Sequence, residues 1–114
     1  MQITVNGHSE RWLRQGFPWV YPNEIAKGKA KPGAIITLVS STGASLGTAV
    51  ADGGWIAARR FRTDEGPLDK AFFIGKLCTS LALRRAVLPP NTTAWRLVHG
   101  ENDGLPGIRV DIYG

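Results

Sequence analysis

The sequence predicts a mainly β protein with short helices, in which a small β-barrel is followed by a helix and a β-hairpin of an incomplete α+β domain. Three observations support this class. Short segments rich in β-branched residues recur between turn residues over the first part of the chain. The segment 69–88 has helical periodicity, and the last residues carry the turn signals of a hairpin. Because closing a sheet removes its exposed edges, a compact barrel is the natural arrangement of the first strands.

The chain opens with a predicted strand and a short helix. Residues Gln2–Val5 alternate apolar and polar side chains, which is typical of a half-buried strand, and Asn6-Gly7 forms a turn. The helix is predicted over Ser9–Gln15, with Ser9 as its N-cap. Gly16 follows in the position that commonly ends a helix.

An aromatic segment follows this helix. Phe17, Trp19 and Tyr21 alternate between two prolines. If they are exposed, their rings can stack on nucleobases, and if they are buried, they cap the barrel. The tract Lys27–Lys31 after them is a basic, Gly-containing loop, either a solvated surface or a phosphate contact.

The next two strands form a predicted hairpin. Ala34–Val39 is dense in β-branched residues, and its predicted partner is Leu46–Val50. Gly47 lies inside the second strand. A glycine in that position indicates a bulge or the close approach of another backbone segment.

A third strand is predicted over Trp55–Arg62. Two adjacent arginines in it, Arg59 and Arg60, must point to opposite faces of the sheet. One of them is therefore expected to turn toward a neighbouring element, with its aliphatic stem packed along the protein.

Asp69–Leu88 is the clearest helix, and Pro89-Pro90 is predicted to end it. Lys76, Ser80 and Arg84 form a polar line along it. The opposite stripe, at helical spacing, is the predicted buried face; it consists of Ile74, Leu77, Cys78 and Leu81. Cys78 is accordingly expected to be a structural thiol.

The strands Trp95–Val98 and Ile108–Ile112 form the predicted C-terminal hairpin. Asp103-Gly104 and Pro106-Gly107 between them are typical reversal residues. His99 is assigned to a strand end. The nearby acids match no metal-ligand spacing, so no metal site and no catalytic residue is predicted; these acids are Glu101, Asp103 and Asp111.

The run at residues 96–107, RLVHGENDGLPG, resembles a segment of the PUA-containing, S-adenosylmethionine-dependent bacterial ribosomal RNA methyltransferases of the 23S rRNA cytosine-5 type. The resemblance extends upstream to AFF at residues 71–73 and to a Gly-x-Pro-Trp-Val-aromatic turn after a basic helix, although residues 52–54 are richer in glycine than the family's usual turn. The matching residues of that turn region are Arg14, Gly16, Pro18, Trp19, Val20 and Tyr21.

This resemblance implies a domain organisation. Residues 1–65 are expected to form a PUA-like RNA-binding domain, and residues 66–114 the start of a linking domain. The family's Rossmann-like catalytic domain follows this point, and the sequence contains no cofactor-binding glycine turn. We therefore expect no catalytic or cofactor-binding residues in this chain. S-adenosylmethionine would serve the full-length parent. The resemblance also favours packing of Trp19, and it places the family's catalytic cysteine in the absent domain rather than at Cys78.

The distribution of charge favours a polyanionic partner. The first 62 residues hold eight basic and three acidic side chains, whereas the remainder holds six of each. The whole net charge of +5 therefore lies in the first part, where it would attract RNA. The candidate RNA-binding residues are Arg11, Arg14, Lys27, Lys29, Lys31, Arg59, Arg60 and Arg62.

These observations predict an RNA-binding module that positions ribosomal RNA for methyl transfer by the absent domain. The alternative is a PUA-like packing or dimerisation module without affinity for RNA. An unfinished sheet edge and apolar helix stripe predict at least partial homodimerisation. No membrane span or secretory signal is present, and the single cysteine fits a reducing compartment, so a cytoplasmic location is expected.

Overall fold

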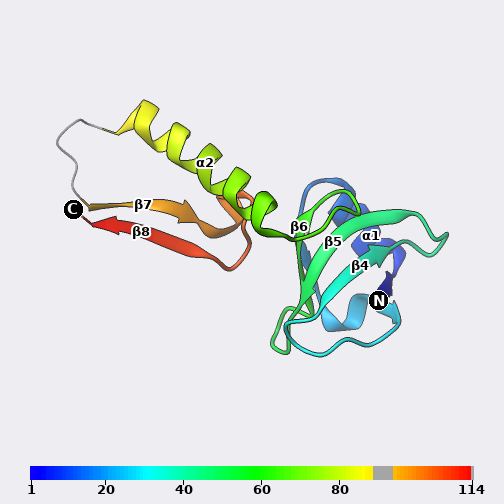
Figure 1. The fold of residues 1–114 in the computed structure, drawn as a ribbon. Coiled ribbons are helices and arrows are strands. Elements are labelled where there is room, and N and C mark those ends of the chain that lie inside the picture. The colour runs from blue at the N-terminus through cyan, green and yellow to red at the C-terminus, as the bar shows by residue number, and fades with distance from the viewer. Residues whose placement is uncertain (89–93, 114) are drawn as a thin grey trace. The chain divides into compact units, whose positions relative to one another are not determined.

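The computed structural model describes residues 1–88 and 94–113, which divide into two compact units, Met1–Leu68 and Asp69–Gly114 (Figure 1). Unit 1 carries a curled sheet and a short helix. Unit 2 carries a long helix and a hairpin. The predicted mainly β class is therefore confirmed, and each unit has its own internal packing.

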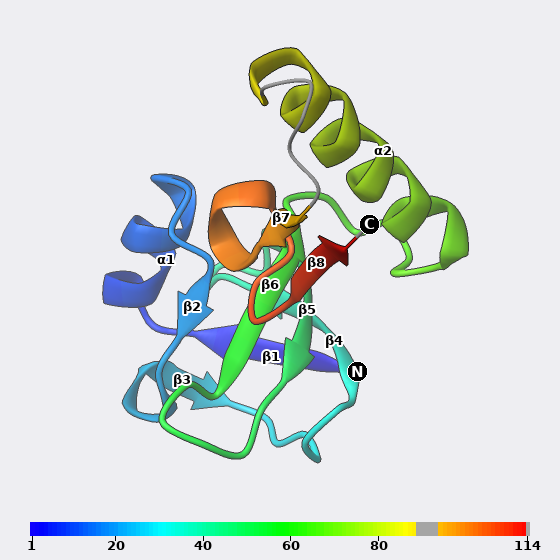
Figure 2. The ribbon, with the colours of Figure 1, turned by 90° about the vertical axis from the view of Figure 1, so that its left-hand side faces the viewer.

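Unit 1 is built on a six-stranded sheet that curls into a half-barrel (Figure 2). Strands β1 and β4 pair in parallel, and all other neighbours pair antiparallel. Apolar side chains inside the curl form the core, among them Ile3, Val5, Leu13 and Leu38. In sheet order the strands are β2 (Trp19–Val20), β6 (Ala58–Arg62), β5 (Ser45–Ala51), β4 (Ile35–Val39), β1 (Gln2–Val5) and β3 (Ile25–Lys27).

Helix α1 (Gly7–Arg14) begins three residues earlier than predicted. Its N-cap is Asn6, whose Oδ1 accepts a hydrogen bond from the backbone N–H of Ser9 at 2.9 Å. Ser9 was the predicted cap, and it instead lies buried in the first turn. Asparagine and serine cap helices equally well. The position of the cap therefore depends on where the preceding strand ends, and β1 ends at Val5, directly before Asn6.

Strand β6 begins at Ala58 rather than at Trp55, so the predicted third strand is too long at its start. Asp52–Ala57 is a turn, closed by a 2.7 Å hydrogen bond from the N–H of Asp52 to the carbonyl of Ala57. Trp55 is 94% exposed on this turn. The alternating pattern of residues 55–62 does not reveal the turn, because the bond that closes it joins Ala57 to Asp52, which lies before the pattern begins.

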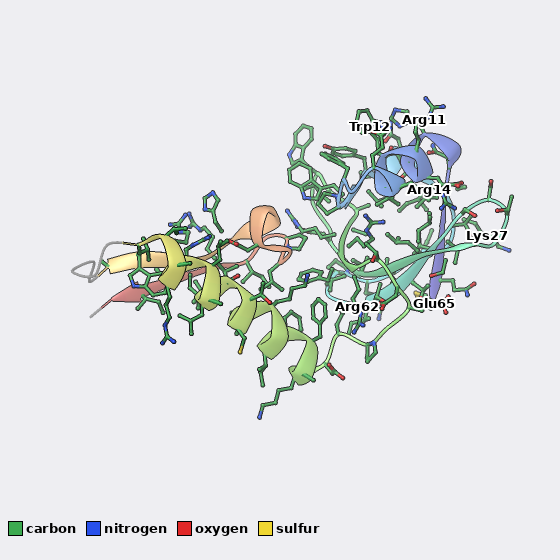
Figure 3. The ribbon with its side chains drawn as sticks, turned by 90° about the horizontal axis from the view of Figure 1, so that it is seen from above. Arg11, Trp12, Arg14, Lys27, Arg62 and Glu65 are labelled. Carbon is green, nitrogen blue, oxygen red and sulfur yellow. The ribbon has the colours of Figure 1, made fainter. Side chains whose placement is uncertain are left out.

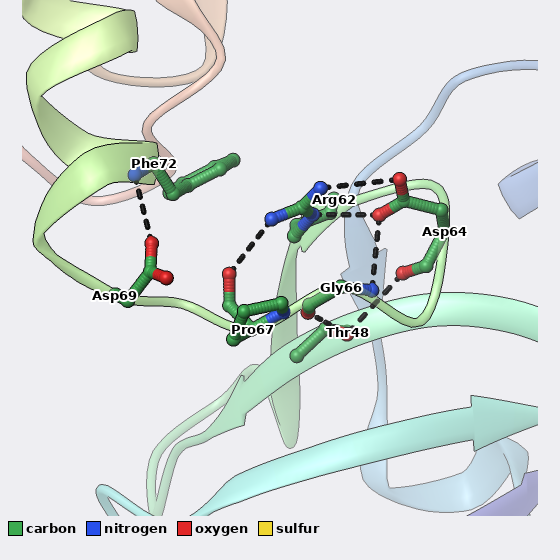
Figure 4. Close-up of polar contacts among 7 residues, drawn as sticks. All are labelled: Thr48, Arg62, Asp64, Gly66, Pro67, Asp69 and Phe72. Carbon is green, nitrogen blue, oxygen red and sulfur yellow. Dashed lines mark hydrogen bonds and ion pairs between the residues drawn. The ribbon is translucent and has the colours of Figure 1, made fainter.

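Unit 2 consists of α2 (Lys70–Val87), β7 (Ala94–His99), a 3₁₀ turn η2 (Gly100–Asp103) and β8 (Arg109–Tyr113). Asp69 caps α2, since its Oδ1 accepts from the N–H of Phe72 at 2.9 Å (Figure 4). Strands β7 and β8 pair antiparallel, as predicted. Pro89-Pro90, the predicted helix stop, lies outside the described residues.

The buried face of α2 differs from the prediction. Ile74 and Cys78 are exposed, whereas Ser80 from the predicted polar line is buried. The reason is a set of polar contacts to the hairpin. The Arg84 guanidinium donates to the carbonyl of Arg96 at 3.0 Å and to the carboxylate of Asp103 at 2.9 Å. These bonds turn the polar line inward, and the apolar periodicity alone does not reveal them.

Asp103 is expected to be a main polar support of unit 2. Its side chain is only 5% exposed, and besides Arg84 it accepts a 2.6 Å bond from the N–H of His99. Replacing it with alanine leaves a partly buried guanidinium without its carboxylate, so Asp103→Ala should destabilise unit 2 by about 2 kcal/mol. Native-state hydrogen exchange of β7 and β8 measures this loss. Asp111→Ala, which removes a more exposed pair with Arg96, should cost less than about 1 kcal/mol. Equal effects of the two changes would contradict the assignment.

Candidate nucleic-acid interface

The C-terminus of α1 forms a Schellman motif that redirects the chain. Gly16 has a φ of 97°, and its N–H donates to the carbonyl of Leu13 at 3.0 Å. The N–H of Phe17 donates to the carbonyl of Trp12 at 3.1 Å. This motif places the rings of Phe17 and Trp12 together, with centroids 6.0 Å apart. The Schellman motif thus brings helix α1 and the aromatic segment into contact.

The aromatic side chains continue from this contact as a chain of rings. Trp12 contacts His8 one turn earlier on α1, at 6.3 Å between centroids, and Phe17 contacts Trp19 at 5.4 Å. They surround a hollow of about 320 Å³. Trp19 is half-buried, so the expected packing of this residue is only partly realised. We call the following set the aromatic hollow: His8, Trp12, Phe17, Trp19, Tyr21 and Glu24.

The floor of the aromatic hollow is held by Glu24, which is buried. Its Oε1 accepts from the backbone N–H of Tyr21 at 2.9 Å, and its Oε2 lies 2.8 Å from Nδ1 of His8. Trp12 Nε1 lies 3.3 Å from the other ring nitrogen of His8. The Nδ1–H tautomer of His8 satisfies both contacts. The carboxylate is therefore fully engaged in positioning the rings.

Four of the eight candidate cations are engaged in contacts within unit 1. Arg60 lies inside and donates to two backbone carbonyls. The other three pair with acids: Arg14 with Glu10, Arg59 with Asp52, and Arg62 with Asp64. Figure 4 shows the Arg62 guanidinium between Asp64 and the carbonyl of Pro67. The hydrogen bond from Arg62 holds the pKa of Asp64 below its usual value.

The other four candidate cations are exposed, and none of them forms an ion pair with a residue in the described part of the chain. They form two groups. Arg11 projects from α1 next to Trp12, whereas Lys27 lies apart from it in Figure 3. Lys27 ends β3, and the chain then runs through a loop to β4. The four residues available to an anionic partner are Arg11, Lys27, Lys29 and Lys31.

Unit 2 has a second, open hollow lined by Ala94, Trp95, Arg96, His99 and Asp111. Arg96 Nε donates to Asp111 at 2.7 Å, and this bond lowers the pKa of Asp111. Across residues 1–88 and 94–113, no group of three or more His, Cys, Asp or Glu side chains is placed to hold a metal ion. The arginine of this hollow is therefore already paired, and these residues provide no metal-ligand set.

Unit 1 is thus a half-barrel of six strands with a capped helix and four exposed, unpaired cations among its candidate residues. Residues 3–63 match the model of the PUA-like domain family. The chain belongs to this family.

Within the described residues, no helix is both long enough and apolar enough to cross a membrane.

Similar proteins cover the whole chain. The chain is 36% identical over 118 residues to the ribosomal RNA large subunit methyltransferase I of Alteromonas mediterranea. The matched region covers 98% of this chain and 30% of that relative. The Vibrio cholerae protein of the same name is 33% identical over 91% of the chain. A putative SAM-dependent methyltransferase from Streptococcus mutans superimposes with a TM-score of 0.86 at 22% identity, over all of this chain and 31% of the other.

A second solved structure, a putative methyltransferase complexed with SAH, superimposes with a TM-score of 0.87 at 22% identity. At this identity the likeness concerns the fold. The likeness covers both units, since it includes 100% of the chain. The chain spans about 30% of the length of the curated relatives that it matches first.

Proposed function

We propose that this chain is the RNA-binding N-terminal module of an S-adenosylmethionine-dependent ribosomal RNA methyltransferase. In this proposal residues 1–65 bind RNA, residues 66–114 begin the linking domain, and a methyltransferase domain of the whole protein uses S-adenosylmethionine. The observation that carries the proposal is the group of exposed, unpaired cations on a PUA-like unit. The names of the relatives support ribosomal RNA as the partner, and ribosomal RNA as substrate supports a cytoplasmic location.

The cations are sorted by their contacts. Arg11, Lys27, Lys29 and Lys31 have side chains available to phosphates, whereas Arg14, Arg59 and Arg62 would have to leave an acid first. Arg60 is buried and is left out of the interface. Because each neutralised phosphate releases counterions, every contact adds to the salt dependence of binding.

The test is RNA binding by the whole chain across a series of salt concentrations, with a structured fragment of 23S rRNA. The change Lys27→Ala, Lys29→Ala, Lys31→Ala should lower affinity and reduce the slope of log K against log salt by about three units, about one for each lysine. The matched control removes three exposed cations of unit 2, through Lys70→Ala, Arg85→Ala and Arg109→Ala. The control should retain most of the slope. Salt-insensitive binding, or equal losses in both variants, would contradict the proposal.

The second candidate is a packing or dimerisation module, and exposed apolar side chains of α2 support it. Leu83 and Val87 lie one turn apart and are exposed, and Ile74 is exposed on the other side of the helix. Covering apolar surface is worth about 25 cal/mol per Å², so these side chains favour association with another protein surface. Light scattering at increasing concentration separates the candidates. A dimer that does not bind RNA favours the second candidate.

A further inference from the structure

We propose that the aromatic hollow binds one unpaired nucleobase of the RNA. This inference rests on the proposed function, because it assumes that unit 1 contacts RNA. It adds a chemical preference that cations alone cannot supply. Phosphate contacts hold any RNA, whereas a ring-lined hollow accepts only a base that has left its stack.

The exposed ring surface supports this occupant. Trp12, Phe17 and Tyr21 are 46%, 37% and 39% exposed, although each lines the hollow. Large aromatic side chains are normally buried when they only stabilise a core. Rings left open to solvent around a concave surface are suited to stacking on the flat face of a base.

The fixed positions of the rings also support binding of an unpaired base. The Schellman motif sets the positions of Trp12 and Phe17, and Glu24 holds His8 and the backbone of Tyr21. A base therefore meets rings that are already positioned.

The surrounding charge selects a nucleic acid over a cationic ligand. An aromatic hollow with a carboxylate would also suit a methylated ammonium group. Here, however, both oxygens of Glu24 are already engaged, by Tyr21 and His8. Arg11 projects from α1 beside Trp12, one of the residues that line the hollow (Figure 3). A cation would be repelled by this arginine, whereas the phosphate next to an unpaired base would be attracted to it.

The test compares two RNA hairpins that differ by one bulged nucleotide, a 2-aminopurine whose fluorescence falls when it stacks. With the whole chain, the bulged hairpin should bind more tightly, and its fluorescence should be quenched. Trp12→Ala should weaken binding of the bulged hairpin about ten-fold and abolish the quenching. The same variant should leave binding of the fully paired hairpin unchanged.

Two further variants control the experiment. Trp55→Ala removes another exposed tryptophan of unit 1, on the Asp52–Ala57 turn, and should change neither affinity nor quenching. Trp12→Phe keeps a stacking ring and should retain most of the quenching, which also shows that loss in Trp12→Ala is not a loss of fold. Thermal unfolding of each variant confirms that unit 1 is intact.

The outcomes separate this inference from the proposed function. Salt-dependent binding that ignores the bulge and Trp12 overturns the base-binding hollow and leaves the RNA-binding module standing. No binding of either hairpin overturns both. Quenching that persists in Trp12→Ala shows that the base stacks outside the hollow, and it also overturns the inference.

Discussion

Replacing Gly47 with alanine is expected to destabilise unit 1 by more than about 3 kcal/mol. Gly47 has a φ of 114°, which side chains rarely adopt. A Cβ at this position would lie 2.0 Å from the carbonyl oxygen of Arg62. That oxygen belongs to the neighbouring strand β6, so it cannot move away without disrupting the pairing of β5 with β6. The loss is comparable to the whole stability of a domain of this size, about 3–10 kcal/mol.

Thermal unfolding followed by circular dichroism measures the effect, which should exceed about 12 °C in Tm. Gly43→Ala is the matched control. Gly43 also has a positive φ, of 87°, but a Cβ there would meet no atom within 4 Å. It should cost only the backbone strain, about 1 kcal/mol. If both variants lost the same stability, the steric explanation for Gly47 would be wrong.

Arg60→Met is expected to destabilise unit 1 by about 3 kcal/mol. Arg60 is 8% exposed, and its guanidinium donates to the carbonyls of Leu46 at 3.0 Å and Leu13 at 2.8 Å. Methionine fills similar space but donates nothing, so two carbonyls lose their partner at about 1–3 kcal/mol each. Part of this loss is offset, because burial of the charge is itself unfavourable and lowers the pKa of Arg60.

Urea unfolding measures the loss of stability in Arg60→Met, and Arg59→Met, at the neighbouring position, is the control. Arg59 lies on the opposite face and pairs with Asp52 at a partly exposed site, so its loss should cost less than about 1 kcal/mol. A loss of stability in Arg60→Met no greater than in Arg59→Met would show that the two buried hydrogen bonds are not important. Any fall in RNA affinity in Arg60→Met should follow the loss of fold and disappear at low temperature.

Local sequence patterns predicted the elements well where neighbouring residues define them. Alternation located β1 at Gln2–Val5 without error, and helical periodicity over Asp69–Leu88 located α2 to within one residue at each end. Gly16 was interpreted correctly as a helix end. Gly47 was predicted to mark a bulge or a close backbone approach, and the backbone of Arg62 does approach it closely. In each case the physical cause lies within a few residues of the signal.

The candidate site was only partly visible in the sequence. The alternation of Phe17, Trp19 and Tyr21 indicated these three aromatic residues. It did not indicate the residues that complete the hollow, which are His8, Trp12 and Glu24. His8 lies one helical turn before Trp12, a spacing that brings two side chains to one face of a helix. That spacing was the available signal. Glu24 offered none, because its contact with His8 spans 16 positions.

By itself, the sequence determined most helices and strands, the separation of a basic first part from a balanced remainder, and the likeness to a PUA-like module. It did not indicate the short strands β2 and β3, or the residues at which α1 and β6 begin. Only the tertiary structure decided which face of α2 is buried, which arginine lies inside, and which cations remain unpaired. The reason is that the interacting residues lie far apart along the chain. Arg60 bonds to residues 14 and 47 positions away, and Arg84 to a carboxylate 19 positions away. No local periodicity contains such partners, so charge alone cannot separate a structural arginine from one that is available to RNA.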